Sequence, residues 1–289
     1  MTAPLPHKDR PYRRQIDGIE TTMIRPQRGL SLANLAELWR FRELALVMVE
    51  RDIRVRYRQT VMGVSWAIAQ PIVMMVVFSI VFGRLAKVPS EGFPYPVFVY
   101  AGLLPWLLFA NAVSHASNAL VAQSQLVSKI YFPRLLLPLS AVGVWLMDFV
   151  IAAFVLMALM LYYGTPFSLG LLLLAPLLAG VLLAALGVGV FFSALIVSYR
   201  DFRYVVPFVI QIWMFATPVI YPLAMIPTEW QWLMHLNPMA GFVDGFRAAF
   251  LGKPLNLGAL AVAAFVAALM FLVGAVYFQR AERRFADVI

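Results

Sequence analysis

Cysteine is absent from the 289-residue chain, and charged side chains are scarce. The lack of cysteine excludes disulfide bonds and thiolate metal sites. The three histidines are dispersed along the sequence, so no metal site is expected. Asp, Glu, Lys and Arg make up only 13% of the residues, about half the share that soluble domains carry. The shortage of charge therefore argues against an ordinary soluble domain.

Two further signatures are missing, one for nucleotide binding and one for secretion. The Gly252-Lys253 pair is followed by Pro254, and Arg247 stands where a P-loop has its first glycine. The opening segment MTAPLPHKDRPYRR has no apolar core of the kind found in a cleaved signal peptide. We therefore expect neither a P-loop nucleotide site nor a removed leader.

Apolar residues dominate the composition instead. They make up 62% of the chain, and the mean hydropathy is +0.82, which indicates a polytopic membrane protein. The formal net charge of +9 would also suit nucleic-acid binding, but the basic residues stand at the ends of apolar runs and no nucleic-acid motif accompanies them. We therefore assign the charge to membrane topology and expect no nucleic-acid partner.

The segment Asp52–Trp66, which reads DIRVRYRQTVMGVSW, is the most informative part of the sequence. Four arginines, Arg51, Arg54, Arg56 and Arg58, stand immediately before the 22 uncharged residues Val61–Phe82. A helix needs about 20 apolar residues to cross the roughly 30 Å hydrocarbon core, and a cluster of cations beside it marks the cytoplasmic end. The pattern predicts a span that starts on the cytoplasmic side.

The apolar runs predict an all-α integral membrane protein with six transmembrane helices. The expected spans are Val61–Phe82, kinked at Pro71, Val97–Val121, Leu135–Tyr162, Leu169–Val197, Tyr204–Tyr221, broken at Pro218, and Leu257–Phe278. Eleven Lys and Arg residues flank the spans on one side and four on the other. This asymmetry predicts that both termini lie in the cytoplasm.

The remaining segments divide into two tails and one surface helix. We expect a flexible cytoplasmic tail at 1–30, an amphipathic interface helix at 31–60, the six-span domain at 61–280 and a cytoplasmic tail at 281–289. Ser31 is the expected N-cap of the surface helix, whose apolar side carries Leu38, Trp39, Leu46, Val49 and Ile53. This helix is expected to lie along the cytoplasmic membrane surface; a helix packed in the cytoplasm is the alternative.

Two short helices are expected between the fifth and sixth spans. Thr228 and Gln231 form a capping-box pattern for the first of them. Asn237 and Pro238 supply an N-cap and a first-turn proline for the second. Both helices are too short to cross a bilayer, so they predict a re-entrant hairpin on the outer side.

Five motifs follow one another along this framework. They are DIRVRYRQTVMGVSW at 52–66, YAGLLPWLLFANAV at 100–113, LVSKIYFPRLLLPLS at 126–140, SYRDFRYVVPFVIQIWMFATPVIYP at 198–222 and LNPMAGFVDGFRAAFLG at 236–252. In this order the chain resembles the permease subunits of ABC-2 type polysaccharide exporters, which move O-antigen, capsule and teichoic acid polymers. The resemblance covers about residues 31–280, and Met62 departs from the leucine that is usual in the family.

The resemblance implies a division of labour between subunits. Such permeases form homodimers and pair with two copies of a separate ABC ATPase, which binds ATP and Mg²⁺, so no cofactor is implied in this chain. The ATPase is expected to contact the surface helix and the short helix at 123–133. The residues expected to couple the two subunits are Glu50, Arg51, Arg54, Arg56, Lys129 and Tyr131.

The implied cargo is a polysaccharide on a polyprenyl diphosphate, carried across a bacterial inner membrane. Arginine binds phosphate oxygens bidentately, so the candidates for the diphosphate are Arg54, Arg56, Arg58, Lys129 and Arg134. Topology signalling and contact with anionic lipids are the alternative roles for each of these cations.

The resemblance also implies that the first and fifth spans line a channel in the dimer. Aromatic rings there would stack on the apolar faces of sugars, which points to Trp66, Phe78, Phe82, Trp213, Phe215 and Tyr221. The alternative is that these rings face lipid or a neighbouring helix. The outer short helices would form an exit gate with Trp230, Asn237, Asp244 and Arg247, or else plug the dimer surface.

Two pairings of charged residues are expected inside the membrane region. Asp148 lies within the third span, where an ionisable group is costly. It acts either as a proton relay or as a hydrogen-bonded tie between helices, with Asn111, Ser114 or His115 as partners. Asp244 and Arg247 are one turn apart and are expected to pair.

The sequence therefore predicts the permease half of an ATP-driven exporter of lipid-linked polysaccharide, and not an enzyme. An ABC-2 exporter of another lipid or of a drug is the first alternative. A membrane glycosyltransferase would need clustered carboxylates, whereas Asp148, Asp201 and Asp244 are isolated. A proton-coupled transporter is a third alternative, weakened because Asp148 is the one charge within a predicted span.

Overall fold

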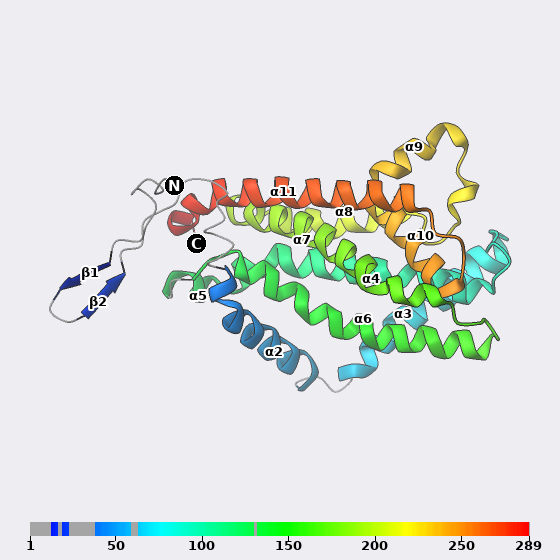
Figure 1. Ribbon diagram of the computed structural model, residues 1–289, viewed down its shortest axis with the longest axis horizontal. Helices are drawn as coiled ribbons and strands as arrows, with labels where there is room; N and C mark the ends of the chain where they lie inside the picture. Colours follow the sequence, from blue (N-terminus) through cyan, green and yellow to red (C-terminus); the bar gives the residue numbers. More distant parts are fainter. Residues whose placement is uncertain (1–12, 17–18, 23–37, 59–62, 130–131, 289) are drawn as a thin grey trace, which may run out of the picture.

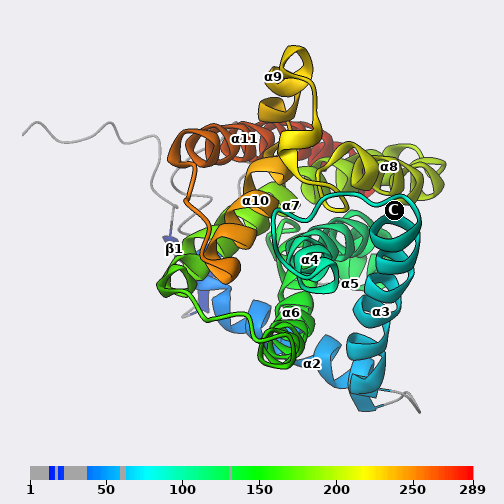
Figure 2. The same ribbon diagram turned by 90° about the vertical axis from the view of Figure 1, so that its right-hand side faces the viewer.

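The structure, a computed structural model, describes residues 13–16, 19–22, 38–58, 63–129 and 132–288. Its helices form an elongated bundle with α4 (Tyr95–Ala122) at the centre (Figures 1 and 2). The start of α2 (Arg42–Arg58), α5 (Ser124–Lys129) and the end of α11 (Leu257–Val288) lie at one end of the bundle. The π-helical segment η1 (Ser79–Leu85) and the short helices α9 (Thr228–Leu236) and α10 (Pro238–Leu251) lie towards the other.

Five helices in the described part of the chain are long and apolar enough to cross a membrane. They are Ser65–Leu85, Tyr95–Ala122, Leu136–Tyr162, Leu169–Ser198 and Leu257–Glu282. The first consists of α3 (Gly63–Phe78), which contains Pro71, and η1; the fourth consists of η2 (Leu169–Leu173) and α7 (Leu174–Ser198). These helices match the first four predicted spans and the sixth within a few residues. The chain is therefore a multi-pass helical membrane protein.

The fifth predicted span is a shorter helix, α8 (Phe202–Ala216). Its 15 residues extend about 22 Å, which is less than the roughly 30 Å hydrocarbon core. The helix ends two residues before Pro218, since proline lacks an N–H and disfavours helical geometry in the residue that precedes it. An irregular segment and the 3-10 turn η3 (Leu223–Met225) then lead to α9 and α10.

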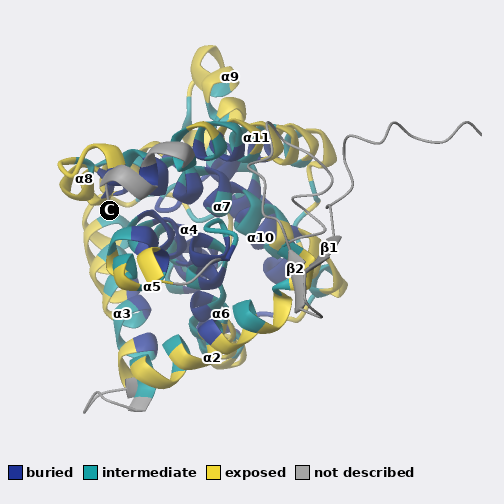
Figure 3. Ribbon diagram, turned by 90° about the vertical axis from the view of Figure 1, so that its left-hand side faces the viewer, coloured by how far each residue is buried: buried dark blue, intermediate teal, exposed yellow. Residues whose placement is uncertain are grey.

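Helix α4 is the most enclosed of the long helices (Figure 3). It packs against α3, α6 (Leu136–Tyr162), α7, α8 and α10, and 18 of its 28 residues are buried. It also corresponds to the least apolar predicted span. Two of its polar side chains find partners within the helix: Ser117 Oγ and Asn118 Nδ2 both donate to the carbonyl of Ser114, at 2.9 and 2.8 Å. A span surrounded by protein need not present an apolar surface to lipid, because its polar groups find partners inside.

Helices α7 and α11 approach each other through glycines. A Cβ added to Gly187 would lie 2.5 Å from the backbone nitrogen of Phe271, and a Cβ added to Gly274 would overlap the carbonyl oxygen of Gly187. Lipid tails are as apolar as the helices, so membrane helices associate chiefly through van der Waals contact, which small residues bring close. The two glycines therefore fix the last span against the fourth.

Helix α2 packs on α6. Near its middle, Met48 Sδ lies 3.9 Å from Ser140 Oγ. Eight residues further along both helices, Arg56 reaches Asp148. Figure 2, in which α6 is seen nearly end-on, shows α2 extending to both sides of it, so the two helices cross. The expected surface helix is therefore joined to the third span, and its place at the membrane surface stays a prediction.

The apolar side chains of this helix divide into two groups. Trp39 and Leu46 are 70% and 66% exposed, whereas Met48, which was not predicted to belong to the apolar side, is buried. The reason is that α2 has one narrow contact seam with α6, and the other apolar side chains remain uncovered by this chain. Ser31, the predicted N-cap, lies outside the described residues.

The ends of the chain contain regular structure that the sequence did not predict. Strands β1 (Arg13–Ile16) and β2 (Ile19–Thr22) pair antiparallel within the predicted tail. Helix α11 continues to Val288 and so includes most of the predicted C-terminal tail.

The caps of the two short outer helices differ from each other. Asn237 caps α10 as predicted, because its side chain accepts a hydrogen bond from the backbone N–H of Met239, and Pro238 takes the first helical position. The predicted capping box of α9 is wrong. Thr228 is already helical, this end has no side-chain cap among the described residues, and Gln231 Nε2 donates to the carbonyl of Ile226 at 3.1 Å instead.

Candidate functional site

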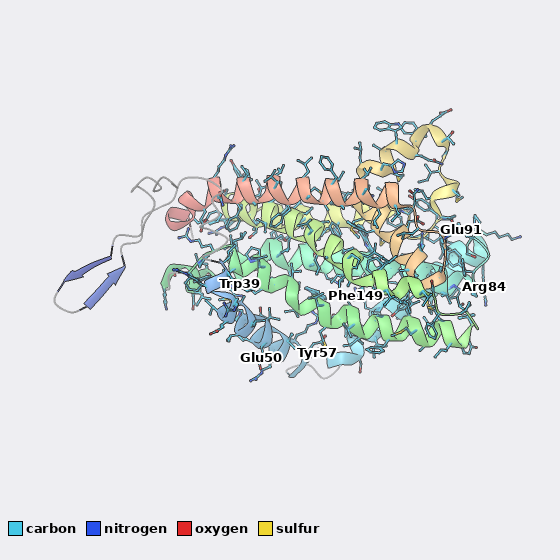
Figure 4. The ribbon with its side chains drawn as sticks, viewed as in Figure 1. Trp39, Glu50, Tyr57, Arg84, Glu91 and Phe149 are labelled. Carbon is cyan, nitrogen blue, oxygen red and sulfur yellow. The ribbon has the colours of Figure 1, made fainter. Side chains whose placement is uncertain are left out.

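The junction of α2 with α6 brings together charged and aromatic side chains from distant parts of the sequence. Arg56 Nη2 lies 2.7 Å from Asp148 Oδ2, and the hydroxyl of Tyr57 donates to the other oxygen of that carboxylate. The Arg56 guanidinium also lies over the Trp145 ring, 3.9 Å from its centroid. The ring of His115 packs edge-on against the same tryptophan at 4.8 Å. Figure 4 shows Tyr57 beside the middle of the bundle.

The position of Asp148 explains why it needs this arrangement. It lies about 18 Å along α6, which is about 40 Å long, so it stands far from both ends of the helix. A carboxylate at this depth is costly unless it is paired. The structure thus favours the interpretation of Asp148 as a tie between helices, but its expected partners are wrong: within the described chain they are Arg56 and Tyr57 of α2, not Asn111, Ser114 or His115.

Tyr57 contributes a proton donor that does not titrate near neutrality. Burial, and then the hydrogen bond to Asp148, raises the pKa of Tyr57 to about 12. The phenol therefore stays protonated at physiological pH and remains a hydrogen-bond donor to Asp148. A small cavity of about 30 Å³ borders this junction between α3, α4 and α6, with Gln70, Asn111 and Asp148 among its lining residues. Such a volume has room for water but not for a sugar ring.

The other predicted coupling residues of α2 point away from α6. Glu50 pairs with Arg54 along the helix surface, and Arg51 pairs with Asp52 at 2.7 Å. The side chains of Glu50 and Arg54 are well exposed. The structure therefore separates one inward cation, Arg56, from two outward ones, Arg51 and Arg54, which the sequence had grouped together.

The cations near α5 are also separated. Lys129 ends this helix and is exposed. Arg134 instead donates Nη1 to the carbonyl of Glu282 in α11 at 2.9 Å, and its guanidinium lies 5.9 Å from the Phe285 ring centroid. The predicted site residues Arg58, as regards its side chain, and Tyr131 lie outside the described residues.

The six aromatic residues predicted to line a channel fall into two groups. Trp66 and Phe215 are exposed, whereas Phe78, Phe82, Trp213 and Tyr221 pack partly against the core. Trp213 stacks edge-on against Phe109 at 5.1 Å and donates to Asn237 Oδ1 at 3.0 Å. Helices α3 and α8 lie on the same side of α4 (Figures 2 and 3). The two exposed rings therefore belong to helices that flank one side of the bundle.

Further apolar side chains are exposed on the same two helices. On α3 and η1 they are Val73, Val76, Val77, Ile80 and Val81, and on α8 they are Tyr204, Val205, Phe208 and Ile212. In a membrane protein such surfaces meet lipid or another subunit, since water would not solvate them favourably.

The predicted ion pair between Asp244 and Arg247 is wrong. Asp244 Oδ1 lies 3.5 Å from Lys253 Nζ, and the same ammonium pairs with Glu91 from the loop before α4. Arg247 is buried and donates to backbone carbonyls of other segments. Residues Glu91 and Arg84 lie at the end of the bundle opposite α5 in Figure 4. The sequence spacing places Asp244 and Arg247 one helical turn apart, but it does not specify partners that come from distant loops.

Helix α9 contrasts with its neighbours. Trp230 and Trp232 are exposed, and none of its nine residues, all of which the structure describes, is buried. Figure 1 shows α9 projecting beyond α11 at this end of the bundle. The predicted outer-gate residues are thus divided between a projecting helix, which carries Trp230, and a buried one, which carries Asp244 and Arg247.

Comparison with known proteins agrees with this architecture. Residues 43–251 match the family model described as ABC-2 type transporter. The chain is 29% identical to the O-antigen export system permease protein RfbA of Klebsiella pneumoniae over 86% of its own length and 95% of the relative's. The corresponding protein of Myxococcus xanthus is 29% identical over 88% and 98%.

A polysialic acid transport protein is similar over a comparable stretch. The polysialic acid transport protein KpsM of Escherichia coli is 26% identical over 80% of this chain and 91% of its own length. The family model spans most of the chain, including α2 and α10 and all the helices between them. The protein therefore belongs to the ABC-2 type transporter family, as a membrane-embedded permease subunit rather than an enzyme.

Proposed function

We propose that this chain is the permease half of an ATP-driven exporter that moves a lipid-linked polysaccharide, such as an O-antigen, across a bacterial inner membrane. The likeness to O-antigen export permeases over most of the chain carries this proposal. ABC-2 permeases leave ATP hydrolysis to a separate subunit, which agrees with the lack of a P-loop here. The energy source is then an ABC ATPase, with two copies bound to a permease homodimer.

The cytoplasmic end supports the expected ATPase contact. The exposed Lys129 lies on α5 at one end of the bundle, and the outward Glu50 and Arg54 lie on α2, which starts at that end. Each of these helices is held to the spans, because Met48 contacts α6 and Val127 of α5 is buried in the same core cluster. Closure of the ATPases would therefore move α2 and α5, and the spans to which they are attached would move with them.

The side formed by α3 and α8 supports the homodimer and the channel. Trp66 and Phe215 are exposed there, next to exposed aliphatic residues. Two copies facing each other across this side would enclose a channel with aromatic walls, on which sugar rings can stack and slide. The short length of α8 would leave its irregular outer end near the exit.

Among the cations whose side chains the structure describes, the outward ones suit the lipid diphosphate best, and Arg58 stays a candidate beside them. Arg54 and Lys129 are exposed, whereas Arg56 pairs with Asp148 and Arg134 binds a carbonyl of α11. We expect Arg54→Gln or Lys129→Gln to lower export while membrane orientation is preserved. Unchanged export in both would assign these residues to topology or lipid contact alone.

The test begins with the chain and a candidate ABC ATPase partner. The two are co-expressed, purified through a tag on the permease alone and reconstituted in lipid. Co-purification at one to one, with vanadate-sensitive hydrolysis that lipid-linked glycan stimulates, is the expected result. An ATPase carrying a disabled P-loop lysine is the matched control.

Two other results would contradict parts of the proposal. Hydrolysis stimulated by a drug or a simple lipid but not by lipid-linked glycan would favour an ABC-2 exporter of another class. If no ATPase associates with the chain, the proposed energy source is wrong.

A further inference from the structure

The outer end of α8 is an open helix terminus at membrane depth. After Ala216 the chain has lost its helical hydrogen bonds, and residues 217–222 have no regular structure before η3. The last carbonyls of a helix need partners, and within a membrane irregular backbone is tolerated only where protein or a water-filled cavity satisfies it. Val219 and Ile220 are nevertheless fully or almost fully buried. Their carbonyl oxygens must therefore be satisfied by the protein itself.

Arg247 of α10 supplies most of these partners. Its Nη1 donates to the carbonyl of Pro218 at 2.7 Å and to that of Tyr221 at 3.4 Å, and its Nη2 donates to Val219 at 2.5 Å. Its Nε donates to the carbonyl of Phe98 in α4 at 3.3 Å. The side chain is 1% exposed, and its guanidinium lies 3.8 Å from the centroid of the Phe98 ring.

Two further side chains complete the set. Tyr95 donates its hydroxyl to the carbonyl of Ile220 at 2.7 Å. Asn237 Nδ2 donates to Thr217 Oγ1 at 2.9 Å and to the carbonyl of Ala216 at 3.4 Å. Its Oδ1 accepts from the Trp213 indole and from the backbone N–H of Met239. One amide therefore caps the end of α8 and the start of α10 together.

Helix α10 is itself fixed by close contacts on several sides. Twelve of its 14 residues are buried. A Cβ added to Gly241 would lie 2.7 Å from Ala263 Cβ of α11, and one added to Gly245 would lie 2.8 Å from a methyl of Leu177 in α7. A helix packed this closely cannot rotate or slide without overlap of backbone and side chains. Helix α9, by contrast, has no such anchoring among its described residues.

We propose that α10 is a fixed bracket for the outer end of α8, held by Arg247 and Asn237 as positioning residues, and that the end of α8 keeps its place on α10 during transport. This inference rests on the proposed export function and assigns α10 to the static frame of the exit instead of to its gate. The guanidinium fork suits this role, because a planar group with five N–H donors can reach several carbonyls at once. Opening at the exit then falls to α9 and to movement between subunits.

The absence of cysteine allows a direct test by reversible crosslinking. The double variant Gly241→Cys/Ala263→Cys joins α10 to α11, and Gly245→Cys/Leu177→Cys joins it to α7. Each is reconstituted with the partner ATPase, oxidised, and assayed for glycan export before and after reduction. The four single-cysteine variants serve as matched controls for any effect of the substitutions, since Gly241 and Gly245 have little space.

If α10 is a fixed bracket, the disulfide-bonded protein should export glycan at a rate within about twofold of the rate of the same sample after reduction. A loss of tenfold or more that reductant restores, absent from the single variants, would overturn the proposal and make α10 a moving gate. Either crosslinked pair suffices, so failure of one double variant to fold leaves the other to decide.

A second measurement does not depend on glycan export. Val219→Cys, at a position with no exposed surface, is treated with a membrane-impermeant maleimide with and without ATP turnover. We expect negligible labelling in the Arg247 background, rapid labelling in Arg247→Met, and an intermediate rate in Arg247→Lys, which keeps the charge but not the fork. Labelling during turnover with Arg247 intact would overturn the proposal.

The two assays separate the inference from the proposed function. If the unmodified protein exports no glycan yet the Val219→Cys variant stays unlabelled, the cargo assignment fails and the bracket stands. If export is normal and oxidation blocks it reversibly, the bracket fails and the proposed function stands.

Discussion

Arg56 and Asp148 form an ion pair that joins α2 to α6, with 2.7 Å between Nη2 and Oδ2. Their side chains are 26% and 15% exposed, so each charge is largely removed from water and depends on the other. Tyr57 adds a second donor to the same carboxylate. This contact fixes the end of the helix that precedes the first span against the third span, and it makes α2 part of the bundle.

Breaking this pair should destabilise the protein. Asp148→Asn removes the negative charge and leaves a half-buried guanidinium that has lost this ion pair, so we expect the free energy of unfolding to fall by about 1–3 kcal/mol. A lower thermal unfolding midpoint in the same detergent would show it. In a double-mutant cycle with Arg56→Gln, the double variant should lose less free energy of unfolding than the sum of the two single variants, by about 1 kcal/mol or more. Strictly additive losses would contradict direct pairing. Arg54→Gln, on the outer face of the same helix, is the matched control and should change little.

Tyr57 should titrate at unusually high pH. Its pKa of about 12 lies above the ordinary value near 10, because burial and the Asp148 hydrogen bond favour the neutral phenol. A group whose folded pKa is raised stabilises the fold fully below its unfolded pKa and loses that contribution as pH rises from 10 to 12. The absorbance titration of the wild-type protein minus that of Tyr57→Phe should therefore show one tyrosine ionising near pH 12. A midpoint near 10 would show that the phenol is neither buried nor bonded.

Arg134 should act as a structural link to α11, unlike its neighbour Lys129. Arg134→Ala removes the hydrogen bond to the Glu282 carbonyl and the contact with Phe285. We therefore expect the free energy of unfolding to fall by about 1–2 kcal/mol. Lys129→Ala, at an exposed site, should change stability by less than about 0.5 kcal/mol. Thermal unfolding of the two variants side by side makes the comparison. If the Arg134→Ala and Lys129→Ala variants are equally stable and Arg134→Ala binds a polyprenyl diphosphate more weakly, Arg134 belongs to the cargo site.

The packing of α7 on α11 should not tolerate an added methyl group at the contact. In Gly274→Ala the new Cβ would overlap the carbonyl oxygen of Gly187, and overpacking of this kind costs about 1–3 kcal/mol. Gly258→Ala, in the same helix, would meet its nearest neighbour at 3.5 Å and should be neutral or slightly stabilising because alanine favours helix. Similar unfolding midpoints for both variants would contradict the close approach of these helices.

The position of the spans could be predicted from the sequence because the bilayer imposes a length and a polarity on each of them. Five predicted spans correspond to helices such as α4 and α6, and α8 ends just before Pro218 as proline geometry requires. The N-cap at Asn237 was equally local, since it depends on a side chain and a backbone N–H two residues away. These features are determined within a few residues of sequence.

The site residues were predicted less well, because charge and spacing do not specify a partner. Asp148 was recognised as costly, yet its partners Arg56 and Tyr57 are about 90 residues away in the sequence. The basic cluster of α2 was treated as one group, but only the packing against α6 separates Arg56 from Arg51 and Arg54. Tyr57 lies in the motif at 52–66 that carries the family resemblance, but the sequence analysis gave it no role.

The sequence by itself determined that this protein is a helical membrane protein of the ABC-2 type, where five of its spans lie to within a few residues, and that it carries no P-loop. Only the tertiary structure decided which charges are satisfied inside and which face outward. Arg247 shows the reason most clearly: its neighbour Asp244 pairs with Lys253, while the guanidinium itself binds carbonyls from α4 and the end of α8. The low-polarity surroundings make every buried polar group depend on a partner, and that partner is chosen by how the helices pack, not by distance along the chain.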